Sequence, residues 1–136
     1  MQLRILVVDD DEQCLDSVES VLVRDGHQIF TATRGLEALE FARRFKEDYQ
    51  RLDLSILDFN MPDLTGIQTF QLLVEEYPAL HGIFISGEVS ETLERSIRLA
   101  GGSALVRKPL DIGRLRHVVG ESVGSNDGCE GRGGVN

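Results

Sequence analysis

The stretch ILVVDDD (residues 5–11) joins a run of four apolar residues to three consecutive aspartates. A continuous apolar run predicts a strand buried on both faces, as in a parallel sheet covered by helices. Three further runs also end in polar residues, namely LSILD (54–58), IFISG (83–87) and ALVRKP (104–109). Ligands of open parallel α/β sheets bind beyond the carboxyl ends of the strands, so these ends predict one shared site.

The chain alternates short apolar runs with segments of helical periodicity, which is typical of repeated βαβ units. The runs predict strands at 3–8, 27–32, 54–57, 83–85 and 104–107. The helices between them are expected to bury Leu15, Val18, Val21, Leu22, Leu39, Ala42, Phe45, Ile67, Phe70, Val74, Leu93, Ile97, Ala100, Ile112, Leu115 and Val119. Five strands and five helices predict a doubly wound, flavodoxin-like α/β sheet with the parallel order 2-1-3-4-5.

Individual residues mark where these helices begin and end. Gly26 is expected to stop the first helix, because glycine adopts the left-handed conformation found after many helices. Thr65 and Gln68 fit a capping box at the start of the third helix, which should end before Pro78. Asp111 can cap the last helix.

Length and charge limit the functions that the chain can have. Its 136 residues suffice for one domain with a hydrophobic core. A formal net charge of −9 argues against nucleic acid or an anionic membrane surface as a direct partner. No apolar run approaches the roughly 18 residues of a membrane span, and no signal peptide is expected. Cys14 and Cys129 do not predict a disulfide, which favours a reducing, cytoplasmic location.

The order and spacing of Asp9, Asp10, Asp58, Ser86 and Lys108 resemble those of the receiver domain of two-component response regulators. The resemblance covers residues 3–122, and it is specific because five separated positions must coincide with the right strand ends. It implies a stand-alone, chemotaxis-regulator-like receiver over residues 1–123. The glycine-rich tail at 124–136 has almost nothing to bury and is expected to be disordered.

The resemblance implies a phosphoacceptor rather than an enzyme acting on other substrates. Asp58 is expected to accept a phosphoryl group from the phosphohistidine of a histidine kinase or histidine phosphotransfer protein. Lys108 and Ser86 are expected to contact the phosphoryl oxygens, and Gly87 to leave room for that group. The switched protein-binding face would then signal to a downstream protein target.

The same resemblance implies a magnesium site. Asp10, Asp58 and the backbone carbonyl of Asn60 are expected to bind Mg²⁺ directly, and Asp9 through a water molecule. Without the metal, repulsion within the carboxylate cluster should raise the pKa of at least one member. The Lys108–Pro109 peptide bond is expected to be cis.

Four positions bear on how such a receiver switches and resets. Ser86 and the residue at 105 are expected to move together on phosphorylation and to remodel the face around the fourth helix, fifth strand and fifth helix. Leu105 stands where the family usually has Tyr or Phe, which predicts a differently packed switch. Asn60 and Glu88 flank the expected path of the hydrolytic water, and this pairing predicts a short-lived phosphoryl state.

Simpler interpretations apply to other polar residues. Asp11 and Glu12 are expected to be first-turn helix acids, and Asp63 a turn residue. The three histidines have no acidic or cysteine neighbour at ligand spacing; they are His27, His81 and His117.

Three alternatives to a complete phosphoacceptor remain open. The chain could be a receiver excised from a hybrid kinase or a longer regulator, and no DNA-binding output domain is expected within these residues. It could be a Mg²⁺-dependent phosphohydrolase with an aspartate nucleophile, although the candidate follows the third strand and no cap is expected. It could be a phosphorylation-independent pseudo-receiver, against which the retained site residues argue.

Overall fold

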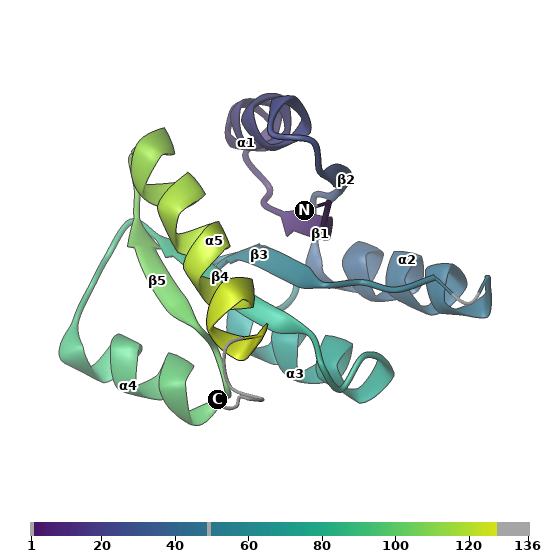
Figure 1. Cartoon of the computed structure of the whole chain (residues 1–136). Helices are drawn as coiled ribbons and strands as arrows, with labels where there is room; N and C mark the ends of the chain where they lie inside the picture. The colour runs from purple at the N-terminus through teal and green to yellow at the C-terminus, as the bar shows by residue number, and fades with distance from the viewer. Residues whose placement is uncertain (1, 49, 128–136) are drawn as a thin grey trace.

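The computed structural model describes residues 2–48 and 50–127, in which a parallel sheet lies between two layers of helices (Figure 1). The strands are β1 (Arg4–Val8), β2 (Gln28–Ala32), β3 (Leu54–Asp58), β4 (His81–Ser86) and β5 (Ala104–Arg107). The helices are α1 (Glu12–Arg24), α2 (Gly35–Glu47), α3 (Gly66–Glu76), α4 (Glu91–Leu99) and α5 (Ile112–Asp127). The strand order is β2-β1-β3-β4-β5, which confirms the predicted topology.

The register of the strands brings the predicted site residues to one edge of the sheet. Val8 at the end of β1 pairs with Leu57, the residue before the end of β3. Ser86 at the end of β4 pairs with Arg107 at the end of β5. The polar residues that follow or end these strands therefore meet beyond their carboxyl ends, as the apolar runs predict.

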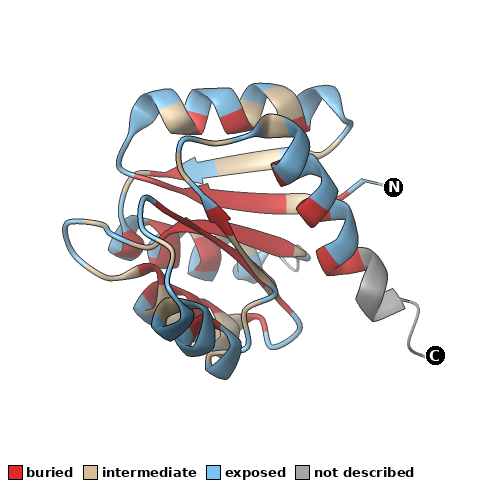
Figure 2. Ribbon diagram, turned by 90° about the vertical axis from the view of Figure 1, so that its left-hand side faces the viewer, coloured by how far each residue is buried: buried red, intermediate tan, exposed pale blue. Residues whose placement is uncertain are grey.

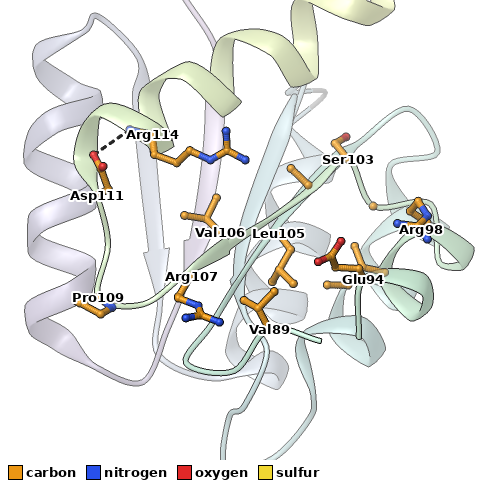
Figure 3. A pocket seen from close by; sticks show the side chains of 13 residues that line it. Val89, Glu94, Arg98, Ser103, Leu105, Val106, Arg107, Pro109, Asp111 and Arg114 are labelled. Carbon is orange, nitrogen blue, oxygen red and sulfur yellow. Dashed lines mark hydrogen bonds between the residues drawn. The ribbon is translucent and has the colours of Figure 1, made fainter. Parts of the chain in front are cut away.

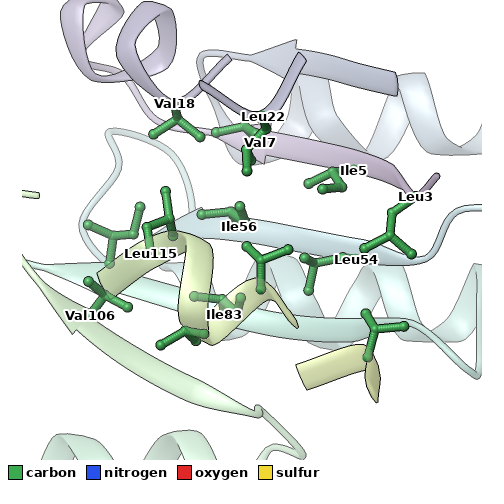
Figure 4. Close-up of a cluster of buried hydrophobic side chains, with 14 of the residues drawn as sticks. Leu3, Ile5, Val7, Val18, Leu22, Leu54, Ile56, Ile83, Val106 and Leu115 are labelled. Atoms are coloured by element: carbon green, nitrogen blue, oxygen red, sulfur yellow. The ribbon is translucent and has the colours of Figure 1, made fainter. Parts of the chain in front are cut away.

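Two hydrophobic clusters form the core, one on each face of the sheet. Figure 4 shows the first, in which β1, β3, β4 and β5 pack against α1 and α5 through residues such as Ile56 and Leu115. The second joins the sheet to α2, α3 and α4 through residues such as Phe70 and Phe84. Coverage on both faces explains why all five residues of β3 are buried, as the red central strands of Figure 2 show.

The expected helix ends are present. Gly26 has a φ of +96° directly after α1, and this left-handed conformation costs glycine little. Thr65 caps α3: its hydroxyl accepts from the backbone N–H of Gln68, whose side chain accepts from the backbone N–H of Thr65. α3 ends at Glu76, before Pro78. These signals are local and can therefore be predicted without tertiary contacts.

Helix α5 runs through Asp127, although the tail was expected to begin at Gly124. The expected disorder of residues 128–136, including Cys129, lies outside the described residues. None of the helices within residues 2–48 and 50–127 is long and apolar enough to span a membrane.

Candidate phosphoacceptor and metal site

Three carboxylates converge beyond β1 and β3. Asp9 is fully buried directly after β1, Asp58 is 6% exposed at the last position of β3, and Asp10 is exposed to solvent. One carboxylate oxygen from each lies within 4.8 Å of one from each of the others. Hard oxygen donors at this spacing form a set that suits a divalent cation such as Mg²⁺.

Lys108 supplies the positive charge of this cluster. Its Nζ lies 2.9 Å from Asp9 Oδ2 and 3.5 Å from Asp58 Oδ1, and its side chain is 25% exposed. The backbone N–H of Lys108 donates to the carbonyl of Ser86 at 2.8 Å, which fixes the chain after β5 against the end of β4. The Lys108–Pro109 peptide bond is cis, as expected.

The site shifts the pKa of two groups upward. Burial, together with the negative charge of Asp9, raises the pKa of Asp58 to about 6, although Lys108 opposes this shift. This direction agrees with the expected repulsion within the cluster, but burial is the larger cause. Burial alone would lower the pKa of Lys108, yet its pairing with Asp9 and Asp58 outweighs burial and raises it.

Ser86 lies fully buried at the end of β4, beside this cluster. Its Oγ accepts a hydrogen bond from the backbone N–H of Glu88 at 3.1 Å. A Cβ added to Gly87 would meet no atom within 4 Å, so the space at the Cβ position of this glycine is open. Asn60 and Glu88 are both exposed at this edge.

Gly66 is a residue of the site that the sequence reasoning did not identify. A Cβ at this position would lie 2.7 Å from the carbonyl oxygen of Asp58 and 3.1 Å from the Cα of Phe59. The start of α3 therefore approaches the backbone of Asp58 more closely than any other residue type allows. A glycine directly after the capping Thr65 was the available signal.

Asp63 has a larger role than that of a turn residue. Its carboxylate accepts from the backbone N–H groups of Gly35 (3.0 Å), Leu36 (2.8 Å) and Leu64 (2.8 Å). Burial alone would raise the pKa of Asp63, but these hydrogen bonds outweigh it and the pKa is lowered. Asp63 thus fastens the loop after Asp58 to the start of α2, and it does not belong to the metal-binding cluster.

Other polar residues near the site have structural partners. Asp11 is the N-cap of α1, where its Oδ1 accepts from the backbone N–H groups of Gln13 and Cys14, and Glu12 is in the first turn. Burial, with a contribution from Asp9, raises the pKa of the Cys14 thiol to about 12, so this cysteine is not a reactive thiolate.

The three histidines do not join the metal-binding cluster in the part of the chain described. His27 accepts from the backbone N–H of Leu3 at 3.0 Å, and the exposed His117 lies 3.4 Å from Glu121. Among the described residues, the potential metal-binding group at β3 consists of Asp9, Asp10 and Asp58, and it contains no histidine. The histidines therefore stay outside the proposed chemistry.

The comparisons with known proteins agree on one family. A family model for the response regulator receiver domain matches residues 5–120. The chain is 35% identical over 109 residues to the uncharacterized transcriptional regulatory protein YrkP of Bacillus subtilis, which covers 80% of this chain and 44% of that protein. This chain thus spans less than half the length of that relative, and less of the plant response regulators that it also matches.

Solved structures show the same fold. A CheY-like receiver domain from Methanospirillum hungatei is 24% identical, has a TM-score of 0.81, and covers 93% of this chain and 98% of its own. CheY in a CheX–CheY–BeF₃–Mg²⁺ complex from Borrelia burgdorferi is 27% identical, with a TM-score of 0.78 and coverage of 88% and 87%. The second structure contains Mg²⁺ and the protein CheX together with that CheY.

Proposed function

Because this chain belongs to the response regulator receiver domain family of two-component signalling, we propose that Asp58 is its phosphoacceptor. The donor is the phosphohistidine of a histidine kinase or a histidine phosphotransfer protein. One observation carries the proposal: the buried Asp58 lies 3.5 Å from the ammonium of Lys108, within a cluster of carboxylates and beside Ser86. Receiver domains are signalling domains, so the only chemistry proposed is on the chain itself.

The proposed transfer moves one phosphoryl group between two proteins. A carboxylate oxygen of Asp58 forms a bond to phosphorus as the P–N bond of the phosphohistidine breaks, and the electron pair of that bond remains on the imidazole nitrogen. The product is an aspartyl phosphate. Because the transition state is loose, the protein acts by positioning the groups and neutralising their charge.

Lys108 and Ser86 are suited to hold the phosphoryl oxygens. Lys108 now neutralises two carboxylates, and a phosphoryl group on Asp58 presents a stronger anion within reach of the same ammonium. The Oγ of Ser86 already accepts from Glu88, so its O–H remains to donate to a phosphoryl oxygen. The open space at Gly87 leaves room for that oxygen.

The three aspartates fit Mg²⁺. Asp10 and Asp58 would bind the ion through their carboxylates, Asn60 through its backbone carbonyl, and Asp9 through a water molecule. When bound, the ion supplies positive charge that offsets the repulsion between the cluster and an incoming phosphoryl group. Burial and the negative charge of Asp9 raise the pKa of Asp58, and a bound cation would offset these effects.

The reset step depends on two exposed residues. We propose that Asn60 and Glu88 border the path of the water that attacks phosphorus, which breaks the P–O bond and releases phosphate and the Asp58 carboxylate. Both side chains lie at the solvent edge of the site. Substituting either residue should change the rate at which the phosphoryl mass is lost, and an unchanged rate in both variants would contradict this role.

The signal is proposed to leave through the face that contains Leu105. Leu105 on β5 is half-buried where a larger side chain is usual in the family, and Ser86 lies one strand away. A Leu105→Tyr variant should change partner affinity in the phosphorylated state. Equal affinities of this variant and the wild type in both states would exclude Leu105 from the switch.

The test is intact mass after incubation with a small phosphodonor, with and without Mg²⁺. The wild type should gain one phosphoryl group only with Mg²⁺, and Asp58→Asn should gain none. The matched variant Asp16→Asn, at an exposed position of α1, should gain it like the wild type. A phosphorylated histidine phosphotransfer domain serves as a second donor. Failure of both donors, or an equal gain in Asp58→Asn, overturns the proposal.

A further inference from the structure

The parallel sheet has two edges, and they border different surfaces. At the β5 edge, a groove of about 630 Å³ opens where α4, β5 and the start of α5 meet, and Leu105 lies in it (Figure 3). Arg98, Arg107 and Arg114 also line this groove, which belongs to the face through which the signal is proposed to leave. At the opposite edge, β2 pairs with β1 alone among the described residues. The proposed function gives no role to this β2 edge.

The β2 edge lacks the features that usually protect a strand edge. The strand reads QIFTA (28–32), without a charged residue or a proline. Natural edge strands often carry one or the other, because an open edge can pair with a strand of another chain. The isoleucine, phenylalanine and threonine at its centre are instead residues that favour strands. This edge is therefore suited to accept a further strand.

The pairing of β2 with β1 determines which of its backbone groups face outward. The backbone N–H of Gln28 donates to the carbonyl of Leu3 at 2.9 Å, so Gln28 faces β1. Neighbouring residues of a strand direct their backbone groups to opposite sides, so those of Phe30 also face β1, and those of Ile29 and Thr31 face outward. An antiparallel second copy of β2 centred on Phe30 would place its Thr31 opposite Ile29. Both residues would then exchange N–H and C=O hydrogen bonds across the edge.

The side of α2 next to this edge carries a charge pattern that matches its own reverse. The pattern, called here the α2 stripe, follows three- and four-residue spacing and consists of Arg34, Glu37, Phe41, Arg44 and Asp48. Two antiparallel stripes centred on Phe41 place Arg34 opposite Asp48, and Glu37 beside Arg44. Arg34 and Asp48 are exposed, and neither forms an ion pair with another described residue.

Aromatic contacts place the α2 stripe beside β2. The ring centroid of Phe41 lies 5.0 Å from that of Phe30 and 5.2 Å from that of Phe45, and all three rings are partly exposed. On the other side of the helix, Arg43 pairs with Glu76 of α3. The centre of the strand pattern, Phe30, thus touches the centre of the helix pattern, Phe41. One twofold axis near these two rings would satisfy both patterns.

We propose that the β2 edge and the α2 stripe form a contact between two copies of this chain, related by a twofold axis near Phe30 and Phe41. In such a contact every favourable pair occurs twice. The aromatic clusters of the two copies would bury their exposed ring surface against each other. A strand of a different protein could also pair with β2, but the α2 stripe matches its own reverse, which favours a second copy. Neither the carboxylate cluster nor the groove at the β5 edge contributes, so the contact goes beyond the proposed function and does not depend on it.

The test is sedimentation equilibrium of the full, unphosphorylated chain, with circular dichroism to verify that each variant is folded. The wild type should form a dimer whose fraction rises with concentration. Arg34→Asp should weaken the dimer by about tenfold or more, because it places like charges opposite each other twice. Adding Asp48→Arg to this variant reverses both members of the pair and should restore the wild-type affinity. Arg114→Asp makes the same change of charge in the groove at the β5 edge and should leave the dimer unchanged.

Amide hydrogen exchange tests the strand pairing separately from the charges. The outward N–H groups of Ile29 and Thr31 should be protected in the dimer and exchange about tenfold faster or more after dilution to the monomer. The N–H of Phe30, which faces β1, should stay protected at both concentrations.

Four results would overturn the inference. They are a monomer at every soluble concentration, a dimer that Arg114→Asp weakens as much as Arg34→Asp, a double variant no tighter than Arg34→Asp alone, and exchange at Ile29 and Thr31 that is independent of concentration. A monomer would leave the β2 edge to a strand of a different protein.

Discussion

Strand β3 and helix α4 differ sharply in how firmly they are held. All five residues of β3 are buried, and its last residue is the proposed phosphoacceptor. α4 buries only Ile97, and Leu99 in its last turn is 82% exposed. The proposed chemistry thus lies on a fully buried strand, and the proposed signalling surface includes a helix that small free energies can move.

This contrast suits a phosphorylation switch. Phosphorylation can shift the equilibrium between two conformations of an element only by as much as it stabilises one conformation more than the other. Rearranging β3 would disturb both hydrophobic clusters, since its Ile56 and Leu57 belong to opposite faces. Rearranging α4 would disturb mainly Ile97 and its neighbours, so a local change at Asp58 and Ser86 has most effect there.

The largest expected effect comes from removing buried side-chain volume. Ile56→Ala in β3 should lower the free energy of unfolding by about 2–5 kcal/mol, because the residue is fully buried and leaves a cavity. Leu99→Ala in α4 should change it by about 0.5 kcal/mol or less, because the side chain is already exposed. Urea unfolding followed by circular dichroism measures both, and equal losses would remove the contrast.

A glycine pair tests the close approach behind Asp58. Gly66→Ala should cost about 1–3 kcal/mol and slow phosphorylation, because the new Cβ meets the backbone of Asp58 and Phe59. Gly120→Ala in α5 should instead gain about 0.5–1 kcal/mol, since the position is helical with no atom within 4 Å. A Gly66→Ala variant that is phosphorylated at the wild-type rate would show that the approach has no role in the chemistry.

The third prediction concerns the charge buried at the end of β3. The raised pKa of Asp58 means that the native chain binds more protons than the unfolded chain between about pH 4 and 6, so stability falls as pH rises through that window. Without metal at pH 8, Asp58→Asn should therefore gain about 1–2 kcal/mol, discounted from the full shift for solvent screening. The gain should shrink toward pH 5, as measured by urea unfolding in a chelator.

Asp63→Asn is the control of opposite sign. The pKa of the Asp63 carboxyl is lower in the folded chain than in the unfolded chain. Its charged form therefore stabilises the fold at pH values above the unfolded-state pKa, and this contribution is lost as the pH falls through the folded-state pKa. The variant should be less stable than the wild type at pH 8. A gain in both variants would point to general relief of the negative net charge rather than to the burial of Asp58.

The smallest effect is expected at the start of α4. The hydroxyl of Ser90 accepts from the backbone N–H of Leu93 at 3.1 Å and caps this helix. Ser90→Ala should cost about 1 kcal/mol and so speed amide hydrogen exchange in α4 about fivefold, with exchange in β3 unchanged. Equal acceleration in both elements would mean that α4 opens only when the whole domain unfolds.

The sequence predicts the enclosed part of the molecule better than the surface. Continuous apolar runs specify strands buried on both faces, and their shared carboxyl edge then brings Asp9, Asp58 and Lys108 together. The capping box of Thr65 and the turn at Gly26 depend on neighbours a few residues away, and both are confirmed.

The features that sequence reasoning missed depend on contacts between distant segments. Asp63 resembles a turn residue until its hydrogen bonds to Gly35 and Leu36 are seen. Gly66 has no obvious purpose until the backbone of Asp58 is found beside it. Likewise, the groove lined by Arg98, Arg107 and Arg114 is recognisable only once α4, β5 and α5 lie together.

The ion pairs of Lys108 with Asp9 and Asp58 also have a consequence for synthesis on the ribosome. Asp9 follows β1 and Asp58 ends β3, whereas Lys108 follows β5, so both carboxylates leave the ribosome long before the lysine does. Parallel strands pair only after long crossovers close, which makes such assembly late. An incomplete chain therefore carries Asp9 and Asp58 without their counter-charge. Under the proposed function, it can accept a phosphoryl group only when the last strand has joined the sheet.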